Sequence, residues 1–205
     1  IAGEYNPTLS FVDGILVDGS RFKGFNITGS MSISNNQSIL IEQCTVDDIS
    51  GFNGTIYESN LNGTLLGLSD NHSIRNILLD SCVSNTNELE YPIIEIPSGG
   101  TNKINVKDYS GVIGLTGTFV TGSVASFDMN SGVVNLLSGI EGGNIYIRGI
   151  GQLYDQTTNE NINLDTSGYY YDVEASYVNL SYRGKVIIDV INGLSGLKYP
   201  IGTLM

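Results

Sequence analysis

Two aspartates, Asp108 and Asp128, have the spacing in this chain that best fits a chemical role. Each stands a few residues ahead of a glycine in one of two similar segments. Stacking of those segments would bring the carboxylates to about 5 Å, the separation that retaining glycosidases use. However, exposed strand positions often carry aspartate, and stacked carboxylates can simply raise each other's pKa. Only Lys107 and Tyr109 adjoin the pair, whereas sugar cleavage needs aromatic platforms and basic groups. We therefore favour a protein without catalytic residues and keep Asp108 and Asp128 as an alternative glycosidase or lyase pair.

Other acidic side chains and one histidine offer weaker sites. Asp47 with Asp48, and Asp13 with Asp18, supply oxygen ligands of the kind that Ca²⁺ takes, but the spacing of an EF-hand loop is absent. We interpret them as solvated turn residues and expect no metal and no cofactor. His72 is flanked by turn formers, so we expect it to be exposed and to take no part in a nucleophilic triad.

Two cysteines, Cys44 and Cys82, are too few for a disulfide scaffold or a zinc site. Both stand in apolar, strand-like runs and are expected to be small buried residues. Their separation matches two layers of about 19 residues each. A disulfide between neighbouring layers is an unsupported alternative. Glu42 and Asp80 each precede a cysteine by two residues and would extend the carboxylate row described above.

The elements that must position these residues are short β-strands. Gly, Asn, Ser and Thr make up 83 of 205 residues, beside 24 Ile and 14 Val, with three Ala and no Trp. Helices would need more Ala, Leu, Glu and Lys. β-Branched residues come instead in short runs cut by turn formers, which predicts an all-β protein with tight corners. Asn and Gly suit such corners because both tolerate the left-handed backbone conformation.

Weak internal repeats predict stacked layers. Ser110–Leu115 recurs as Ser131–Leu136, shifted by 21, and Gly24–Thr28 recurs as Gly51–Thr55, shifted by 27. Coils of about 20–27 residues with strands of three to five residues are typical of a parallel β-helix, a solenoid in which each turn buries its aliphatic side chains against the next. A β-sandwich is the alternative, although it would show longer alternating strands.

Three segments follow from this pattern. Residues 1–20 are expected to cap the solenoid, residues 21–155 to form it, and residues 156–205 to form a small antiparallel β subdomain. Two loops are expected to protrude, at 85–92 and 97–102. Six of the 12 tyrosines fall in the last segment, and we expect them to form a subunit interface, where tyrosine is enriched. The tyrosines assigned to this interface are Tyr169, Tyr170, Tyr171, Tyr177 and Tyr182.

The charge balance restricts the partners. Twenty-one acidic residues against nine basic ones give a net charge of −12. Nucleic-acid binding needs clustered Lys and Arg to neutralise phosphates, so no nucleic-acid partner is expected. Anionic membrane surfaces are disfavoured for the same reason, and no apolar stretch approaches the ~20 residues that span a bilayer.

The coil size and the Asn/Gly corners of residues 21–155 resemble the right-handed parallel β-helix family. That family includes pectate-lyase-like enzymes and the tailspikes and appendages of bacteriophages. The acidic, Ala-poor composition with a Tyr-rich end resembles the phage proteins more closely. The resemblance implies a homotrimeric structural virion protein, a spike, fibre or capsid decoration on the virion surface or outside the cell. Its partners would be other virion proteins and a cell-surface polysaccharide. A carbohydrate-active enzyme and a bacterial surface adhesin are the alternatives.

Overall fold

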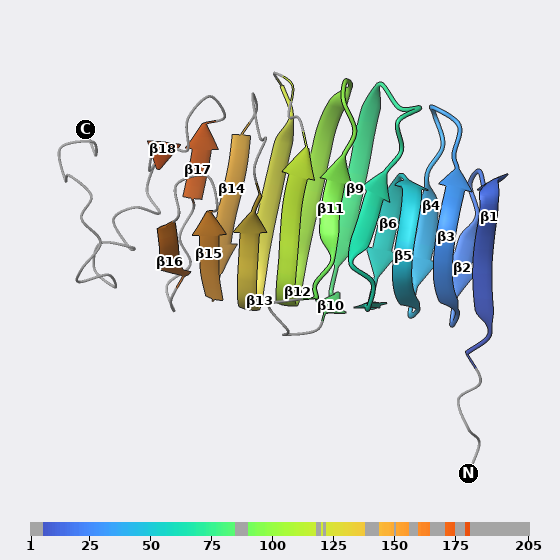
Figure 1. Cartoon of the computed structure of the whole chain (residues 1–205), viewed down its shortest axis with the longest axis horizontal. Coiled ribbons are helices and arrows are strands. Elements are labelled where there is room, and N and C mark those ends of the chain that lie inside the picture. Colours follow the sequence, from blue (N-terminus) through green and yellow to red (C-terminus); the bar gives the residue numbers. More distant parts are fainter. Residues whose placement is uncertain are drawn as a thin grey trace, which may run out of the picture.

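The computed structural model describes residues 6–84, 90–117, 120, 122–137, 144–149, 151–155, 160–164, 171–174 and 179–180. This part of the chain is all β, with a largely parallel multi-stranded sheet and no helix, and so with no helix that could cross a membrane. In Figure 1 the strands follow one another along the long axis in sequence order. The strands are β1 Thr8–Leu16, β2 Arg21–Lys23, β3 Asn26–Ser32, β4 Ile39–Glu42, β5 Thr45–Phe52, β6 Gly54–Tyr57, β7 Asn60–Leu61, β8 Leu65–Leu68, β9 Ile74–Asp80, β10 Val83–Ser84, β11 Ile93–Ile96, β12 Thr101–Gly117, β13 Val124–Leu136, β14 Asn144–Gly149, β15 Gly151–Asp155, β16 Glu160–Leu164, β17 Tyr171–Glu174 and β18 Asn179–Leu180.

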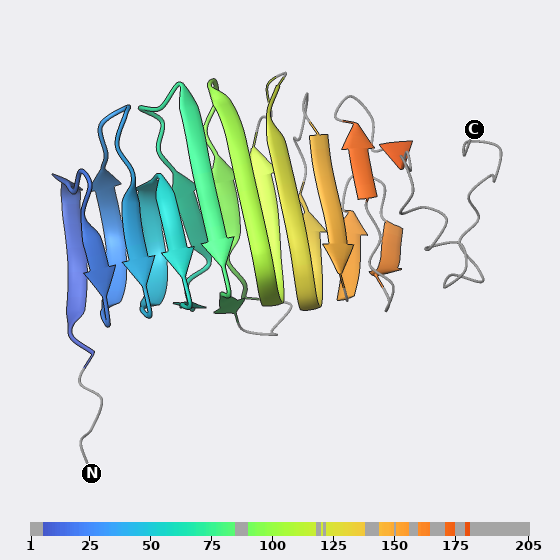
Figure 2. The same ribbon diagram turned by 180° about the vertical axis from the view of Figure 1, so that it is seen from behind.

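Most of the strands form two long series, and within each series neighbours pair in parallel. The short strands β7 and β10 pair in parallel with each other and link β5 to β12 in a third, shorter row. The first series is β2, β4, β6, β9, the first half of β12, the first half of β13, and β14. The second series is β1, β3, β5, β8, β11, the second halves of β12 and β13, and β15. The two series are seen from opposite sides in Figures 1 and 2. A β-sandwich is built from antiparallel strands, and no antiparallel pair occurs among the described strands up to β15.

The layers of the first series differ in length along the chain. Leu40 pairs with Thr55, whereas Leu78 pairs with Asn105, so the later layer is almost twice as long as the earlier one. The predicted repeat of Ser110–Leu115 is confirmed, because its residues pair in order with those of Ser131–Leu136. The second predicted repeat is wrong. Gly54 pairs with Ile39 and Ile77, not with the segment around Ile27.

Alternate residues of the first series point inward and build the core. Ile41, Ile56, Leu79, Val106, Phe127 and Ile147 occupy one register column, and each is fully buried. Successive side chains of a strand point to opposite faces, so the residues between them face outward. Gly54 belongs to the neighbouring inward column. A Cβ there would lie 2.1 Å from the backbone oxygen of Ile39, so this close approach of two strands requires glycine.

A left-handed residue turns the chain from the first series to the second. Gln43, Glu58, Ser81 and Asp108 hold this position with φ between 47° and 55°. The N–H of Glu58 donates to the Asp80 carbonyl at 3.0 Å, and the N–H groups of Gly24, Gln43 and Ser81 make the equivalent bond in their layers. We expected Asn or Gly at the corners, and at this corner Gly24 alone follows the expectation. Glycines with positive φ do occur at other positions of the layers, at Gly29, Gly111 and Gly132. The repeated backbone bonds hold a conformation that costs each side chain about 1–2 kcal/mol.

The cysteines follow this corner and point inward. Both are buried free thiols, as the sequence predicted for small core residues. Ser59 holds the same position in the layer between them, because Asn60 N–H donates to Cys44 O and Val83 N–H to Ser59 O. Two layers correspond to about 9.5 Å between backbones, beyond the ~7 Å that a disulfide can bridge.

Pairing becomes antiparallel towards the end of the chain. β15 pairs antiparallel with β16, β14 with β17, and β17 with β18. This agrees with the antiparallel strands expected in residues 156–205, whereas the subdomain boundary stays a prediction. At the other end β1 pairs with β3 as the later strands do, so residues 8–16 are part of the sheet. The loop predicted at 97–102 is shorter than expected, since Thr101 and Asn102 already belong to β12. Most of the other predicted loop, 85–89, lies outside the described residues.

Candidate functional site

A polar groove lies on the outer face of the first series. It has a volume of about 680 Å³, and its floor comes from β6, β9 and β12. The segment from residue 35 to 38, which precedes β4, forms its wall. Most of its lining side chains are amides and hydroxyls. The described residues that line it are Asn35, Asn36, Gln37, Ser38, Asn53, Gly54, Thr55, Ser73, Ile74, Asn76, Ile77, Leu78, Lys103 and Asn105.

Buried polar side chains fix the wall of the groove. His72 is 3% exposed and its Nε2 lies 3.1 Å from the Gln37 carbonyl oxygen. A carbonyl only accepts, so Nε2–H donates, while Nδ1 lies 3.0 Å from Ser69 Oγ. Asn53 Nδ2 donates to the same Gln37 oxygen at 2.9 Å. The expectation that His72 is exposed is therefore wrong, because the wall segment, far from it in sequence, covers it.

The side-chain oxygens of two amides, Asn35 and Asn53, also accept hydrogen bonds from the segment that leads into the floor. Asn35 Oδ1 accepts a hydrogen bond from the Ser73 backbone N–H at 2.9 Å. Asn53 Oδ1 accepts one from the Asn76 backbone N–H at 3.0 Å. These bonds join segments that are distant in sequence, so the groove keeps its shape without a ligand to organise it.

A buried arginine supports the floor from inside. Arg75 is 1% exposed and points into the protein at the start of β9. It donates to the backbone oxygens of Ser69 and Gly99, the second at 2.7 Å, and to Asn102 Oδ1 at 3.1 Å. Desolvation lowers the pKa of Arg75, yet a guanidinium stays charged in proteins. The charge is held by dipoles of two chain segments, one at Ser69 and the other from Gly99 to Asn102, which fixes the starts of β9 and β12 beside the groove.

The floor presents groups that both donate and accept hydrogen bonds. Thr55, Leu78 and Asn105 share one outward column, and Asn76 and Lys103 share the next. An amide offers two donors and an acceptor, and a hydroxyl offers one donor and two lone pairs. Such groups match a polyhydroxylated ligand, because each sugar hydroxyl also donates and accepts. Sequence reasoning missed these residues, having assigned asparagine to the corners. Their only sequence signal is their alternation with buried Ile and Leu in β9 and β12.

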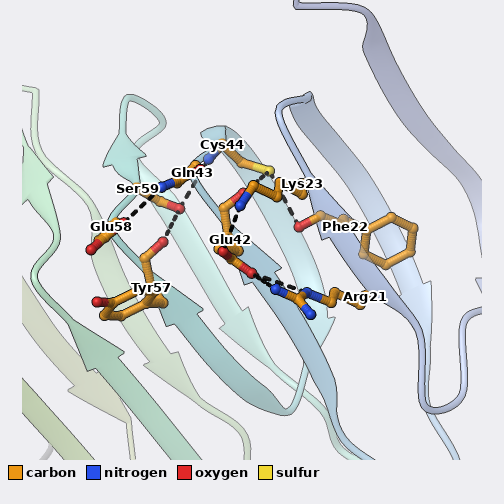
Figure 3. A network of polar contacts seen from close by, with 9 residues as sticks. All are labelled: Arg21, Phe22, Lys23, Glu42, Gln43, Cys44, Tyr57, Glu58 and Ser59. Atoms are coloured by element: carbon orange, nitrogen blue, oxygen red, sulfur yellow. Dashed lines mark hydrogen bonds and ion pairs between the residues drawn. The ribbon is translucent and has the colours of Figure 1, made fainter.

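A separate row of charged side chains runs along the edge near the left-handed corner (Figure 3). The Glu42 carboxylate forms ion pairs with Arg21 and with Lys23, the latter at 2.9 Å. Hydrogen bonds from Lys23, which has the larger effect, and from Arg21 lower the pKa of the Glu42 carboxyl group. In the next layer the Tyr57 hydroxyl lowers the pKa of Glu58, and the Glu58 carboxylate raises that of Tyr57. Gln43 Nε2 also donates to Glu58 at 2.8 Å.

Asp128 belongs to this row, and Asp108 stands beside it. Lys107 and Asp108 together face Asp128 alone, because β12 carries one extra residue at this point. Such two-against-one pairing is a β-bulge. Asp108 is the exposed left-handed residue of its corner, whereas Asp128 is half-buried. Glu42 and Asp80 lie in the same column, two layers apart, as the predicted carboxylate row requires. Asp80 also pairs with Lys107, so a basic side chain interrupts that row.

The aspartates that could have held Ca²⁺ bind the chain itself. The expectation that all of them are turn residues is wrong, because Asp13 lies in β1 and Asp47 and Asp48 lie in β5. Asp48 Oδ1 accepts from the backbone N–H groups of Thr64 and Leu65, the latter at 2.9 Å, and Asp18 accepts from the Ser34 N–H. Ser34 lowers the pKa of Asp18. No cluster of three or more potential metal ligands occurs among the residues the structure describes. Of the predicted interface tyrosines, Tyr169, Tyr170, Tyr177 and Tyr182 lie outside the described residues, and Tyr171 is described only as the start of β17.

Comparison with models of protein families, with curated proteins and with solved structures found no match to this chain.

Proposed function

We propose that this chain is a parallel β-helix that serves as a rigid, adhesive shaft in a phage spike, fibre or capsid decoration. The observation that carries the proposal is the continuous parallel pairing from β1 to β15, with a fully buried apolar column inside the first series. In such an array each layer is stabilised by its neighbours, so stiffness follows from repetition. The acidic surface favours solubility of an exposed particle component.

The adhesive surface is the polar groove over β6, β9 and β12, and its ligand is a cell-surface polysaccharide. Amides and hydroxyls line it, with Ile74 half exposed at its margin. This combination suits sugar rings, which have hydroxyl edges and apolar C–H faces. The wall and the floor are fixed by buried hydrogen bonds from His72, Asn53 and Arg75, so binding needs little ordering of the protein.

Assembly is assigned to the Tyr-rich end. The chain forms a homotrimer through residues 156–205, and other virion proteins attach there. The particle is placed on the virion surface or in the extracellular medium. The alternative setting, a bacterial surface adhesin, uses the same shaft and groove.

Two measurements test the shaft and its adhesion. Sedimentation velocity and small-angle scattering should give an elongated particle with three times the 22.0 kDa chain mass. A compact monomer would refute the shaft. Binding to a polysaccharide panel should weaken roughly 3- to 10-fold with Asn105→Ala, the loss of one hydrogen bond. Ser126→Ala is the matched control, because Ser126 pairs with Asn105 in the same outward column and does not line the groove.

One observation favours the enzymatic alternative, and another weighs against it. Asp108 in β12 stands at the bulge opposite Asp128 in β13. The backbones of two such neighbouring strands are about 5 Å apart. Left-handed residues can mark active sites, but four other layers repeat this conformation at the same corner, three of them with a side chain. Release of reducing ends from a bound polysaccharide, abolished by Asp108→Asn or Asp128→Asn, would establish hydrolysis. Binding without cleavage supports the adhesive role.

A further inference from the structure

Lys103 stands out in the groove because it is the one charged side chain among the described residues that line it. The chain has 21 acidic and nine basic residues, yet the lining contains a cation and no carboxylate. We infer that the groove binds an acidic oligosaccharide and that Lys103 holds a carboxylate of the sugar. This inference rests on the proposed carbohydrate-binding role of the groove and adds the charge of the ligand.

The position of Lys103 leaves its ammonium group available to a ligand. Lys103 lies in β12 between Asn76 of β9 and Val124 of β13, and its side chain is exposed. Within the described part of the chain Lys103 forms no ion pair; the pairs there join Glu42 to Arg21 and Lys23. An ammonium offers three donors and no acceptor, so it contributes to binding chiefly through an anion or a carbonyl.

The carboxylates of the row of charged side chains, Asp80 and Asp128, are too distant to neutralise Lys103. Asp80 pairs with Lys107, four residues further along β12 than Lys103. Four residues of a strand span about 13 Å, beyond the ~8 Å Debye length at physiological ionic strength. Asp128 faces the bulge at Lys107 and is equally far along the strands. The net negative charge of the chain therefore does not prevent a local attraction between Lys103 and an anionic group.

The neutral groups around Lys103 complete the recognition of an acidic sugar. Asn105 is two residues further on the same face, about 7 Å away, and Asn76 pairs directly with Lys103. A ligand carboxylate on Lys103 brings neighbouring hydroxyls over these amides. Sugar acids carry both kinds of group on one ring, whereas a simple anion such as phosphate would leave the amides of the groove unused.

The experiment compares acidic oligosaccharides with their carboxyl-reduced counterparts, which differ only in having CH₂OH in place of each carboxylate. A panel of hexuronic-acid oligosaccharides is measured against the full chain by calorimetry at low and high salt, about 0.05 and 0.5 M. We expect at least one acidic member to bind roughly tenfold more tightly than its reduced form, and this preference to shrink at high salt. Lys103→Gln should remove the preference and leave the affinity for the reduced form unchanged.

Lys107→Gln is the matched control, since Lys107 is exposed on the same strand and does not line the groove. Equal binding of acidic and reduced forms, or equal losses in Lys103→Gln and Lys107→Gln, would overturn the inference while the groove's role in binding sugars stands. If neither form of any panel member binds, both the inference and the sugar-binding role fail.

Discussion

Leu79→Ala removes a side chain from the centre of the inward column and tests the layered core directly. Leu79 is fully buried on β9, between Ile56 of β6 and Val106 of β12, which are also fully buried. Truncation of a buried leucine costs about 2–5 kcal/mol, from lost transfer free energy and the cavity that remains. Strands on both sides are held by their own backbone bonds and cannot collapse into the gap, so we expect about 3 kcal/mol or more. For a chain of this size that lowers Tm by roughly 6–12 °C.

The adjacent residue provides the control. Leu78 has the same side chain, one position earlier on β9, but faces the groove and is half-buried. Leu78→Ala should cost about 1 kcal/mol, because only part of its surface is removed from water. Thermal and urea unfolding followed by circular dichroism give both values under the same conditions. Equal destabilisation by the two substitutions would refute the assignment of inward and outward faces in β9.

Three other predictions concern backbone, charge and thiols. Gly132→Ala places a Cβ 1.9 Å from the backbone oxygen of the neighbouring layer, whereas Gly122→Ala, also at positive φ, meets nothing within 4 Å. Gly132→Ala should therefore lower the unfolding free energy by about 1–3 kcal/mol more than Gly122→Ala, and equal losses in urea titrations would show that the close approach is absent. The lowered pKa of Glu42 implies stability that is present above its usual value of 4.5 and is lost as pH falls through the folded value. Glu42→Gln should flatten this acid-side loss in urea midpoints measured between about pH 3 and 6, and an unchanged pH profile would contradict the ion pairs. Burial raises the pKa of the Cys82 thiol to about 11, so Cys82 should react with a disulfide reagent at about pH 8 only after unfolding. Rapid reaction of Cys82 in the native chain would show that the corner is open.

The strand content and part of the layering were predictable from the sequence for a simple physical reason. Neighbouring layers place similar residues at the same position, so Ser110–Leu115 and Ser131–Leu136 could be aligned from their residue types alone. The separation of Cys44 from Cys82 by two layers could be predicted in the same way, although these layers are unequal in length, with Ser59 closer in sequence to Cys44 than to Cys82. The second predicted repeat, between Gly24–Thr28 and Gly51–Thr55, is wrong because a short match rich in Gly and Asn also arises between segments that do not stack on each other.

The groove was not predictable, because its parts come from distant segments. Whether Asn76 and Asn105 share a face depends on a long layer whose length the local sequence does not announce. The position of His72 depends on a wall segment far earlier in the chain. The flanking turn formers suggested exposure, and burial came from that covering segment.

Composition and alternation by themselves determined that this chain forms short strands with one aliphatic face, since those properties depend on neighbours in sequence. Tertiary structure decided which outward side chains meet, which loop covers the face, and where a lone lysine stands among amides. The unequal lengths of the layers decide which outward side chains become neighbours. These lengths are fixed only when backbone hydrogen bonds and core packing select one register over the others.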